Sequence, residues 1–299
     1  MKSHSFLILS ILIISTLSTS LFAAPIRIVA ALPDLGSIAS YIGGDKVAVS
    51  TIAKANSNPH SVEVFPSYMA QVSKASVYLK SGLALDQWSD AIIDGSRNNR
   101  IVAIDCSEGI AVLEKPTGKV DASMGDVHAF GNPHYWLNPE NGIMIAQNIA
   151  TVLQKVDPVN TAYYSSRLEQ FRKECLDKIS AWKEKLKSLR GAKIMTYHSS
   201  WAYFADAFGF SIVAKVEPFP GIPPSGNHLA KLVKVIKNEN VSFIIQEPYF
   251  SDDALRFLNR QTGVKVFKCA PSCSDIKLTS YFEHFDEIVN QLAAAAGGK

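Results

Sequence analysis

Short apolar runs alternate with longer amphipathic stretches along the chain from residue 26 onward. The apolar runs show little polar alternation, which is typical of parallel strands buried on both faces. Strands separated by helices in this way indicate α/β layers joined by right-handed crossovers. We therefore predict two series of four strands, at 26–31, 47–53, 76–80 and 101–104, and at 193–197, 211–216, 241–246 and 264–268. The helices expected among them lie at 35–42, 66–74, 201–208, 228–238 and 252–262.

A polar segment between the two series, residues 160–189, is rich in Lys and Glu and contains neither Gly nor Pro. Its apolar residues recur mostly every three or four positions, which predicts an amphipathic helix about 45 Å long. The predicted buried stripe consists of Tyr163, Leu168, Phe171, Cys175, Ile179, Trp182 and Leu186. We therefore predict two α/β lobes, each with a parallel-type sheet flanked by helices, joined by one long rigid helix. The expected divisions are 24–155 for the N-terminal lobe, 156–190 for the connecting helix and 191–299 for the C-terminal lobe.

The chain begins with a pattern typical of a secretory signal peptide. Lys2 supplies one positive charge, an apolar run follows at 6–14, and small residues end the segment at Ala23 and Ala24. The alternative is a retained membrane anchor, because residues 6–24 could just span a thin bilayer. We expect cleavage near Ala23 or Ala24, with 1–23 as the signal peptide. Since no Cys follows the cleavage position for lipid attachment, we predict a soluble periplasmic protein.

Composition and charge narrow the class of protein. The chain has 299 residues, 47% of them hydrophobic, and a formal net charge of +3 without a basic block, so we expect no nucleic-acid partner. Four Cys without a CxxC pair argue against a disulfide scaffold and a zinc finger. In an oxidising compartment Cys269 and Cys273 could bridge across a turn. The alternative is four buried thiols, the state expected for Cys175.

Three histidines lie in similar local settings. His60 follows the strand at 47–53, His134 lies just before a predicted helix, and His198 directly ends the strand at 193–197. Ligands of open α/β sheets bind at the carboxyl ends of strands, so three imidazoles there would suit Zn²⁺ better than Ca²⁺ or Mg²⁺. Their sequence separations match no local metal motif such as HExxH. The alternative for each is a histidine hydrogen-bonded to the backbone or to a carboxylate.

At these residues the sequence resembles the zinc- and manganese-binding solute-binding proteins of bacterial ABC transporters, known as cluster A-I or cluster nine. The resemblance covers nearly the whole chain after the signal peptide. It is carried by 58–63 (Asn-Pro-His-Ser-Val-Glu), 75–88, 132–139 (Asn-Pro-His-Tyr-Trp-Leu-Asn-Pro) and Tyr197-His198 with Tyr203-Phe204. It implies two lobes joined by a rigid helix, with the metal between them and ligands at His60, His134 and His198. A His rather than a Glu at position 198 implies the zinc branch, with Zn²⁺ preferred to Mn²⁺.

The sequence departs from the family pattern in two places. Ala270 stands where many members have an Asp ligand, so we take Glu247, at the end of the strand at 241–246, as the first candidate for the fourth ligand. Water and Asp275 are the alternatives, and Glu247 could instead cap a helix or hydrogen-bond a ligand histidine. The His-rich loop of many zinc importers is also missing. The corresponding segment, 115–131, offers only His128, which we expect to be a solvated loop residue, with Asp121 and Asp126.

The resemblance implies that the protein captures Zn²⁺ in the periplasm and delivers it to an ABC permease and its ATPase. We expect a monomer and no enzymatic activity. A periplasmic zinc-dependent hydrolase, with the same three histidines and Glu247 as general base, is the alternative, although HExxH and GxSxG are both absent. A metal-binding adhesin or storage protein is a further alternative that the sequence does not separate from a transport protein.

Overall fold

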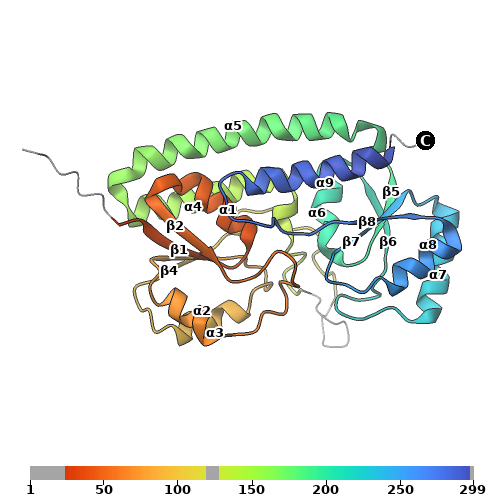
Figure 1. Ribbon diagram of the computed structural model, residues 1–299, viewed down its shortest axis with the longest axis horizontal. Coiled ribbons are helices and arrows are strands. Elements are labelled where there is room, and N and C mark those ends of the chain that lie inside the picture. Colours follow the sequence, from red (N-terminus) through yellow and green to blue (C-terminus); the bar gives the residue numbers. More distant parts are fainter. Residues whose placement is uncertain (1–23, 119–127, 297–299) are drawn as a thin grey trace, which may run out of the picture.

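The computed structural model describes residues 24–118 and 128–296, which form two α/β halves side by side beneath one long helix (Figure 1). We refer to the described residues of 24–156 as the N-terminal half and to 191–268 as the C-terminal half. The predicted signal peptide, 1–23, lies outside the described residues, as do Asp121 and Asp126. Within the described residues, no helix combines the length and the apolar character needed to cross a bilayer.

Each half contains a four-stranded parallel sheet, as the apolar runs predict. The first sheet has the order β2-β1-β3-β4 and the second the order β6-β5-β7-β8. Every strand begins and ends within two residues of its predicted bounds. The strands are β1 (Ile26–Ala30), β2 (Val47–Thr51), β3 (Val77–Lys80), β4 (Val102–Asp105), β5 (Lys193–Thr196), β6 (Ser211–Lys215), β7 (Phe243–Gln246) and β8 (Lys265–Lys268). In each sheet the order reverses beside the first strand, which places a ligand-binding crevice at its carboxyl edge.

Helices cover the sheets and join the halves. The helices expected from the sequence are present as α1 (Pro33–Gly43), α2 (Pro66–Val72), α6 (Ala202–Phe208), α7 (Gly226–Glu239) and α8 (Asp253–Thr262). The long helix predicted within 160–189 is α5 (Thr161–Lys185), and the remaining helices are α3 (Trp88–Gly95), α4 (Pro139–Val156) and α9 (Ser280–Ala296). Helix α4 begins at a proline behind Asn138, whose side chain accepts a hydrogen bond from the Glu140 amide at 2.9 Å. Such a cap supplies a partner for a helix N–H that has none within the helix.

Helix α5 is the long connecting helix, 25 residues in the structure. Its buried face begins at Tyr164 rather than at the predicted Tyr163, because Tyr164 lies one turn before Leu168 and its hydroxyl donates to Asp157 at 2.6 Å. The rest of the predicted stripe is buried. In Figure 1, α5 runs along the backs of both halves, with α9 beneath it.

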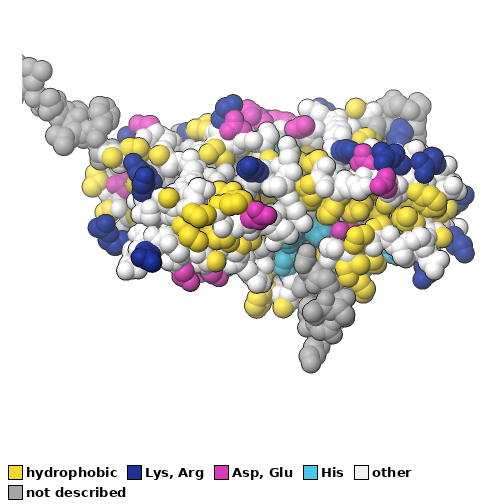
Figure 2. Space-filling view, turned by 60° about the horizontal axis from the view of Figure 1, so that its bottom comes forward, with side chains coloured by type: hydrophobic (Ala, Val, Ile, Leu, Met, Phe, Trp, Pro, Cys, Tyr) yellow, Lys and Arg dark blue, Asp and Glu magenta, His cyan; other side chains and the backbone are white. Residues whose placement is uncertain are grey.

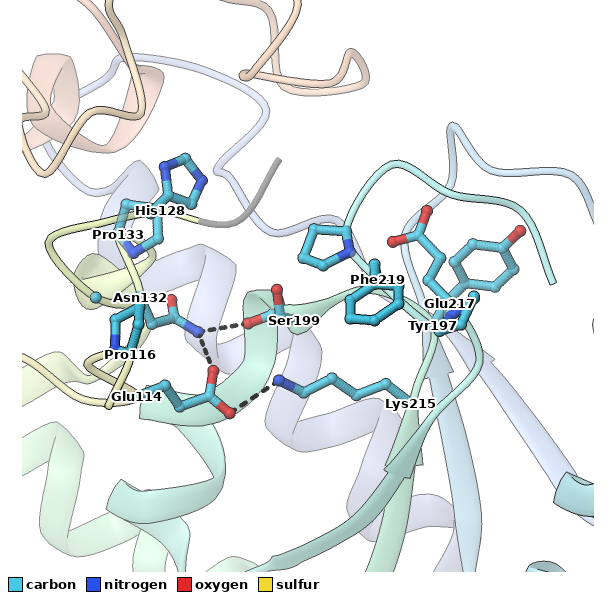
Figure 3. Close-up of a pocket in the computed structure, with 13 residues that line it drawn as sticks. Glu114, Pro116, His128, Asn132, Pro133, Tyr197, Ser199, Lys215, Glu217 and Phe219 are labelled. Carbon is cyan, nitrogen blue, oxygen red and sulfur yellow. Dashed lines mark hydrogen bonds and ion pairs between the residues drawn. The ribbon is translucent and has the colours of Figure 1, made fainter. Parts of the chain in front are cut away.

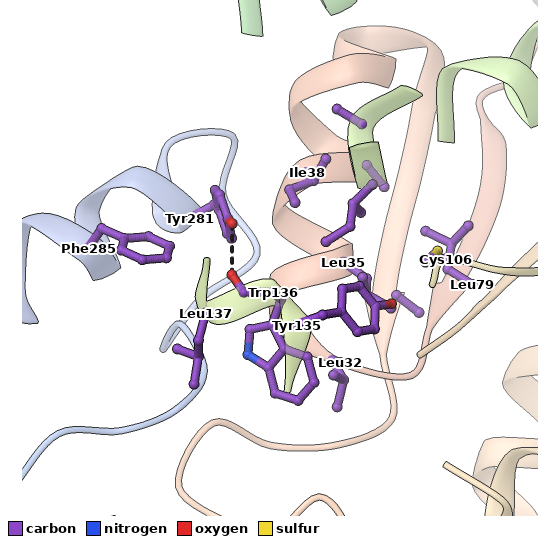
Figure 4. Close-up of a cluster of buried hydrophobic side chains, with 14 of the residues drawn as sticks. Leu32, Leu35, Ile38, Leu79, Cys106, Tyr135, Trp136, Leu137, Tyr281 and Phe285 are labelled. Carbon is purple, nitrogen blue, oxygen red and sulfur yellow. Dashed lines mark hydrogen bonds between the residues drawn. The ribbon is translucent and has the colours of Figure 1, made fainter. Parts of the chain in front are cut away.

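The chain returns to the N-terminal half after the last strand. Trp136 donates its indole N–H to the Pro271 carbonyl at 2.7 Å, and the Tyr281 hydroxyl donates to the Trp136 carbonyl at 2.8 Å (Figure 4). Helix α9 then runs beneath α5, where the rings of Trp182 and Phe285 stack with centroids 5.1 Å apart. The segment 271–281 thus contacts the N-terminal half although it falls within the predicted C-terminal lobe, and the predicted lobe boundaries stay a prediction.

All four cysteines are free and buried, so the expected alternative of a Cys269–Cys273 bridge is wrong and that of four buried thiols is confirmed. The Cys269 thiol donates to the Gln291 side chain at 3.3 Å, whereas the Cys273 thiol donates to the Asp275 carbonyl at 3.2 Å. The two sulfur atoms therefore have separate partners. Burial raises the pKa of the Cys269 thiol to about 12, which makes it a poor nucleophile.

Gly142 gives a test of the contact between α4 and the returning segment. A Cβ at Gly142 would lie 2.6–2.9 Å from atoms of the buried Tyr281 ring and hydroxyl. Ala is favoured over Gly in a helix by about 1 kcal/mol, but overpacking a core costs about 1–3 kcal/mol. We expect Gly142→Ala to lower the free energy of unfolding by about 1 kcal/mol in urea denaturation.

The matched control is Gly226→Ala in the first turn of α7, where a Cβ would meet no atom within 4 Å. We expect this variant to be at least as stable as the parent. Equal stability of the Gly142→Ala variant and the parent would mean that Tyr281 can move aside.

Candidate metal centre

Two of the three candidate histidines lie in the same local structure. His60 and His134 each end an Asn-Pro-His sequence, and in each the Asn side-chain oxygen accepts the backbone N–H of the His at 3.0 Å. The bonds join residues two apart, as in an Asx turn. The repeated sequence therefore gives two histidines the same tight turn, one beyond β2 and one ahead of α4.

His198 comes from the other half. It lies two residues beyond the end of β5 in an extended conformation and immediately precedes the short 3-10 turn Ser199–Trp201. The parallel strands of this sheet all end at the same edge, so the side chain lies at the carboxyl edge of the C-terminal sheet. The rule for open α/β sheets predicts this position.

The structure brings the three imidazoles together. His60, His134 and His198 each offer one nitrogen, and these atoms all lie within 4.8 Å of one another. The Nε2 atoms of His60 and His134 are 3.1 Å apart. Nitrogen ligands at 2.0–2.1 Å from a tetrahedral zinc would be about 3.3 Å apart, so this spacing fits a shared cation. Figure 2 shows histidine side chains gathered between the two halves.

Each ring has a different partner on its other nitrogen. The Nδ1 atom of His134 lies 3.0 Å from Asn132 Oδ1. That of His198 lies 2.7 Å from Glu217 Oε2. That of His60 lies 3.1 Å from His128 Nε2. Partners of this kind orient a metal-binding ring and set its tautomer. An amide or carboxylate oxygen only accepts, so His134 and His198 each carry a proton on Nδ1, and in His134 the lone pair is then on Nε2.

Sequence reasoning missed these partners. Glu217 follows the end of β6 by two residues, so the rule that identified His198 would also have found it. Asn132 belongs to the Asn-Pro-His sequence itself. The expectation that His128 is a solvated loop residue is wrong, because it is half-buried and contacts His60. His128 also lines two cavities, of about 330 Å³ and 450 Å³, that flank the cluster.

Burial controls the charge of the cluster. Desolvation lowers the pKa of His60 well below 6.5, and the neighbouring His198 and His128 lower it further. Desolvation likewise lowers the pKa of His134 well below 6.5, with His60 as the next cause. These two rings are therefore neutral at neutral pH, which is the form that binds a metal.

The two carboxylates considered as a fourth ligand lie in different surroundings. Glu247 directly follows β7, is fully buried, and accepts a hydrogen bond from the Trp201 indole at 3.0 Å. Its Oε2 has no hydrogen-bond partner at an ordinary distance among the described residues, and desolvation raises its pKa. Asp275 is half-exposed and pairs with Lys277 at 2.9 Å. Neither belongs to the group of described ligand atoms within 4.8 Å of one another.

Comparison of the sequence with known proteins finds a matching family profile and individual relatives. The profile of the ZnuA family, described as "Zinc-uptake complex component A periplasmic", matches residues 28–295. The manganese ABC transporter substrate-binding lipoprotein PsaA of Streptococcus mitis is 26% identical over 253 residues, 81% of this chain and 78% of that protein.

Solved structures agree with these sequence matches. A zinc-bound deletion mutant of ZnuA is 27% identical, with a TM-score of 0.79 over 92% of this chain and 100% of that one. The substrate-binding protein FpvC of Pseudomonas aeruginosa in complex with Mn²⁺ is 25% identical, with a TM-score of 0.78 over 91% of this chain and 98% of that one. The predicted fold, two parallel sheets flanked by helices, is confirmed.

The lowered pKa values predict how His60 and His134 titrate. A histidine of ordinary pKa is roughly three-quarters protonated at pH 6. We expect the ring resonances of His60 and His134 in metal-stripped protein to remain those of neutral imidazole from pH 7.5 to pH 6, measured by NMR.

Urea-denatured protein is the control, and there the same rings should titrate near 6.5. Below that pH the unfolded chain binds protons that the folded chain does not, so the stability of the metal-stripped fold should fall as the pH drops through 6.5. Protonation of both rings in the folded protein at pH 6 would contradict the prediction.

Proposed function

Because the chain belongs to the ZnuA family, and is thus a metal-binding substrate-binding protein of an ABC transporter, we propose that its cargo is Zn²⁺. The observation that carries this proposal is the convergence of the His60, His134 and His198 nitrogens within 4.8 Å. The first two come from the N-terminal half and the third from the C-terminal half, so the ion would be bound between the halves. We propose these three histidines as its ligands.

The donor atoms support zinc over manganese. Imidazole nitrogen suits Zn²⁺, whereas carboxylate, carbonyl and water oxygen suit Mn²⁺. The Streptococcus mitis relative has a manganese name and the solved ZnuA deletion mutant has zinc bound, so both ions occur among similar chains. A site with three nitrogen donors should therefore prefer Zn²⁺ to Mn²⁺.

Glu247 is our proposed fourth group. A cation at the cluster would stabilise its buried carboxylate, because Oε2 has no partner at hydrogen-bond distance among the described residues. Its oxygen lies outside the group of three histidines, so direct ligation requires a movement of the side chain or of the halves. A zinc–oxygen distance of about 2.0–2.2 Å would mark direct ligation, and a longer one a bridging water.

The remaining parts of the proposal concern the partner proteins, the cellular compartment, the oligomeric state and catalysis. Substrate-binding proteins of ABC transporters act outside the cytoplasm with a permease and an ATPase, and we propose that this chain delivers zinc to such a pair in the inner membrane. We propose a periplasmic monomer, freed by cleavage of residues 1–23 and without a lipid anchor. The family consists of substrate-binding proteins, and no observation on the described residues favours the hydrolase; we expect stoichiometric zinc binding without turnover of ester or peptide substrates.

The histidine ligands can be tested by titration. Zn²⁺ and Mn²⁺ are titrated in competition with a chelating dye into the metal-stripped parent and the His134→Ala variant. We expect one tight zinc site in the parent, weaker manganese binding, and a loss of zinc affinity of at least 100-fold in the variant, because losing a ligand should exceed the 10–100-fold cost of losing an outer partner. His284→Ala, a buried histidine outside the cluster, is the control. Unchanged affinity in His134→Ala would remove this residue from the site.

The fourth group needs a separate variant. Glu247→Gln keeps the shape of the side chain and an oxygen for the Trp201 indole while it removes the negative charge. We expect zinc affinity to fall about 10-fold or more, because the carboxylate no longer offsets the charge of the ion. Ala270→Asp, which restores the family carboxylate, should tighten binding or change the metal preference. Parent-like affinity in Glu247→Gln would leave Glu247 as a structural residue.

A further inference from the structure

A cluster of hydrogen bonds around Asn132, which we call the clasp, holds the residues before His134 against the C-terminal half. The Asn132 backbone amide donates to the Leu113 carbonyl at 2.9 Å, which pairs the two ends of the segment between them. Tyr203, from α6, joins both ends: its hydroxyl accepts from the Leu113 amide at 3.0 Å and donates to the Asn132 carbonyl at 2.9 Å. The chain ahead of His134 is therefore fixed by a side chain of the opposite half.

The side chain of Asn132 lies at the centre of this clasp. Its Nδ2 donates to Glu114 Oε2 at 2.8 Å and to the Ser199 carbonyl at 2.7 Å (Figure 3). A carboxylate and a carbonyl only accept hydrogen bonds, so the amide nitrogen must face them. Its Oδ1 then faces His134, where it accepts the backbone N–H and lies 3.0 Å from Nδ1. The amide orientation thus determines which nitrogen of His134 has the free lone pair.

Glu114 connects this amide to the C-terminal sheet. Its second carboxylate oxygen lies 2.9 Å from the Lys215 ammonium, at the end of β6. Glu114 also has a φ of +47°, a left-handed conformation that is unfavourable for a residue other than Gly. Backbone strain of this kind is concentrated at functional sites. The side chain of Glu114 contacts Asn132 through one carboxylate oxygen and Lys215 of the opposite half through the other.

We propose that Asn132 and Glu114 are positioning residues of the metal site, and that the Lys215–Glu114 pair makes the orientation of His134 depend on contact between the two halves. The proposal rests on the proposed function for its metal. The Lys215 and Glu114 side chains are 33% and 41% exposed, and ion pairs this exposed contribute little to stability. Loss of the pair should therefore change metal affinity more than thermal stability.

The experiment measures zinc affinity, melting temperature and the His134 tautomer in the full chain. The variants are Asn132→Leu, Glu114→Gln, Lys215→Met and the double variant Glu114→Gln/Lys215→Met. We expect zinc affinity to fall about 10–100-fold in Asn132→Leu and about 3–10-fold in each charge variant. The double variant should bind no more weakly than the weaker single variant, because both remove one interaction.

Long-range ¹H–¹⁵N NMR of metal-stripped protein reads the tautomer. His134 should carry its proton on Nδ1 in the parent and should populate the Nε2–H form in Asn132→Leu. Glu239→Gln is the matched control, since Glu239 pairs with Lys193 across the surface at 2.6 Å with similar exposure. It should leave zinc affinity unchanged, and Glu114→Gln should melt at the same temperature as this control.

The outcomes separate the two proposals. Parent-like zinc affinity in both Glu114→Gln and Lys215→Met would overturn the role of the pair, and it would leave the zinc site intact. An unchanged His134 tautomer in a folded Asn132→Leu variant would overturn the role of the amide. A parent protein that binds no zinc would overturn the proposed function, and the tautomer would then decide the positioning role by itself. If Asn132→Leu does not fold, the surface variants decide.

Discussion

The packing of α5 against α4 and α9 holds the carboxyl edges of two separate sheets opposite each other, and the histidine cluster depends on this packing. One continuous cluster of buried apolar side chains includes Phe171 and Trp182 of α5, Phe285 of α9 and residues of both halves. A metal site tolerates errors of only about 0.2 Å in ligand distance. Two of the clustered histidines come from one half and one from the other, so a flexible linker could not place them with that accuracy. The stiff helix and the returning segment supply the rigidity instead.

Burial also keeps the imidazole rings of His60 and His134 in the neutral form that binds a metal. A buried imidazole loses the hydration that would stabilise its charged form, so the pKa values of His60 and His134 lie well below 6.5. The same burial would leave a polar nitrogen without a partner, and His198 Nε2 has none at hydrogen-bond distance among the described residues. Buried polar atoms without partners destabilise a fold. An arrangement that costs stability in this way is intelligible if a cation supplies the missing interaction.

The sequence allowed prediction of what depends on local pattern. Buried strands can be predicted from apolar runs in the sequence. His60 and His198 could then be assigned to positions after strands, because ligands of open α/β sheets bind at the carboxyl ends of strands. The return of residues 271–281 to the N-terminal half could not be predicted, since contacts such as that of Trp136 with Pro271 join residues 135 apart without any local signature. His128 was misjudged for the same reason. Its partner His60 lies 68 residues away, and composition alone suggested a solvated loop.

The three rings also differ in where their supports originate. His198 is supported by Glu217 of its own half, and His60 by His128 of its own half. His134 alone among the three is supported by an amide that is held from the opposite half, through the Ser199 carbonyl and, by way of Glu114, through Lys215. A substrate-binding protein must bind its ion tightly and later release it to a permease. If the halves separate, His198 moves away from His60 and His134, and the support of His134 weakens in the same movement. A single separation of the halves would then disturb two of the three clustered histidines together, His198 directly and His134 through its support.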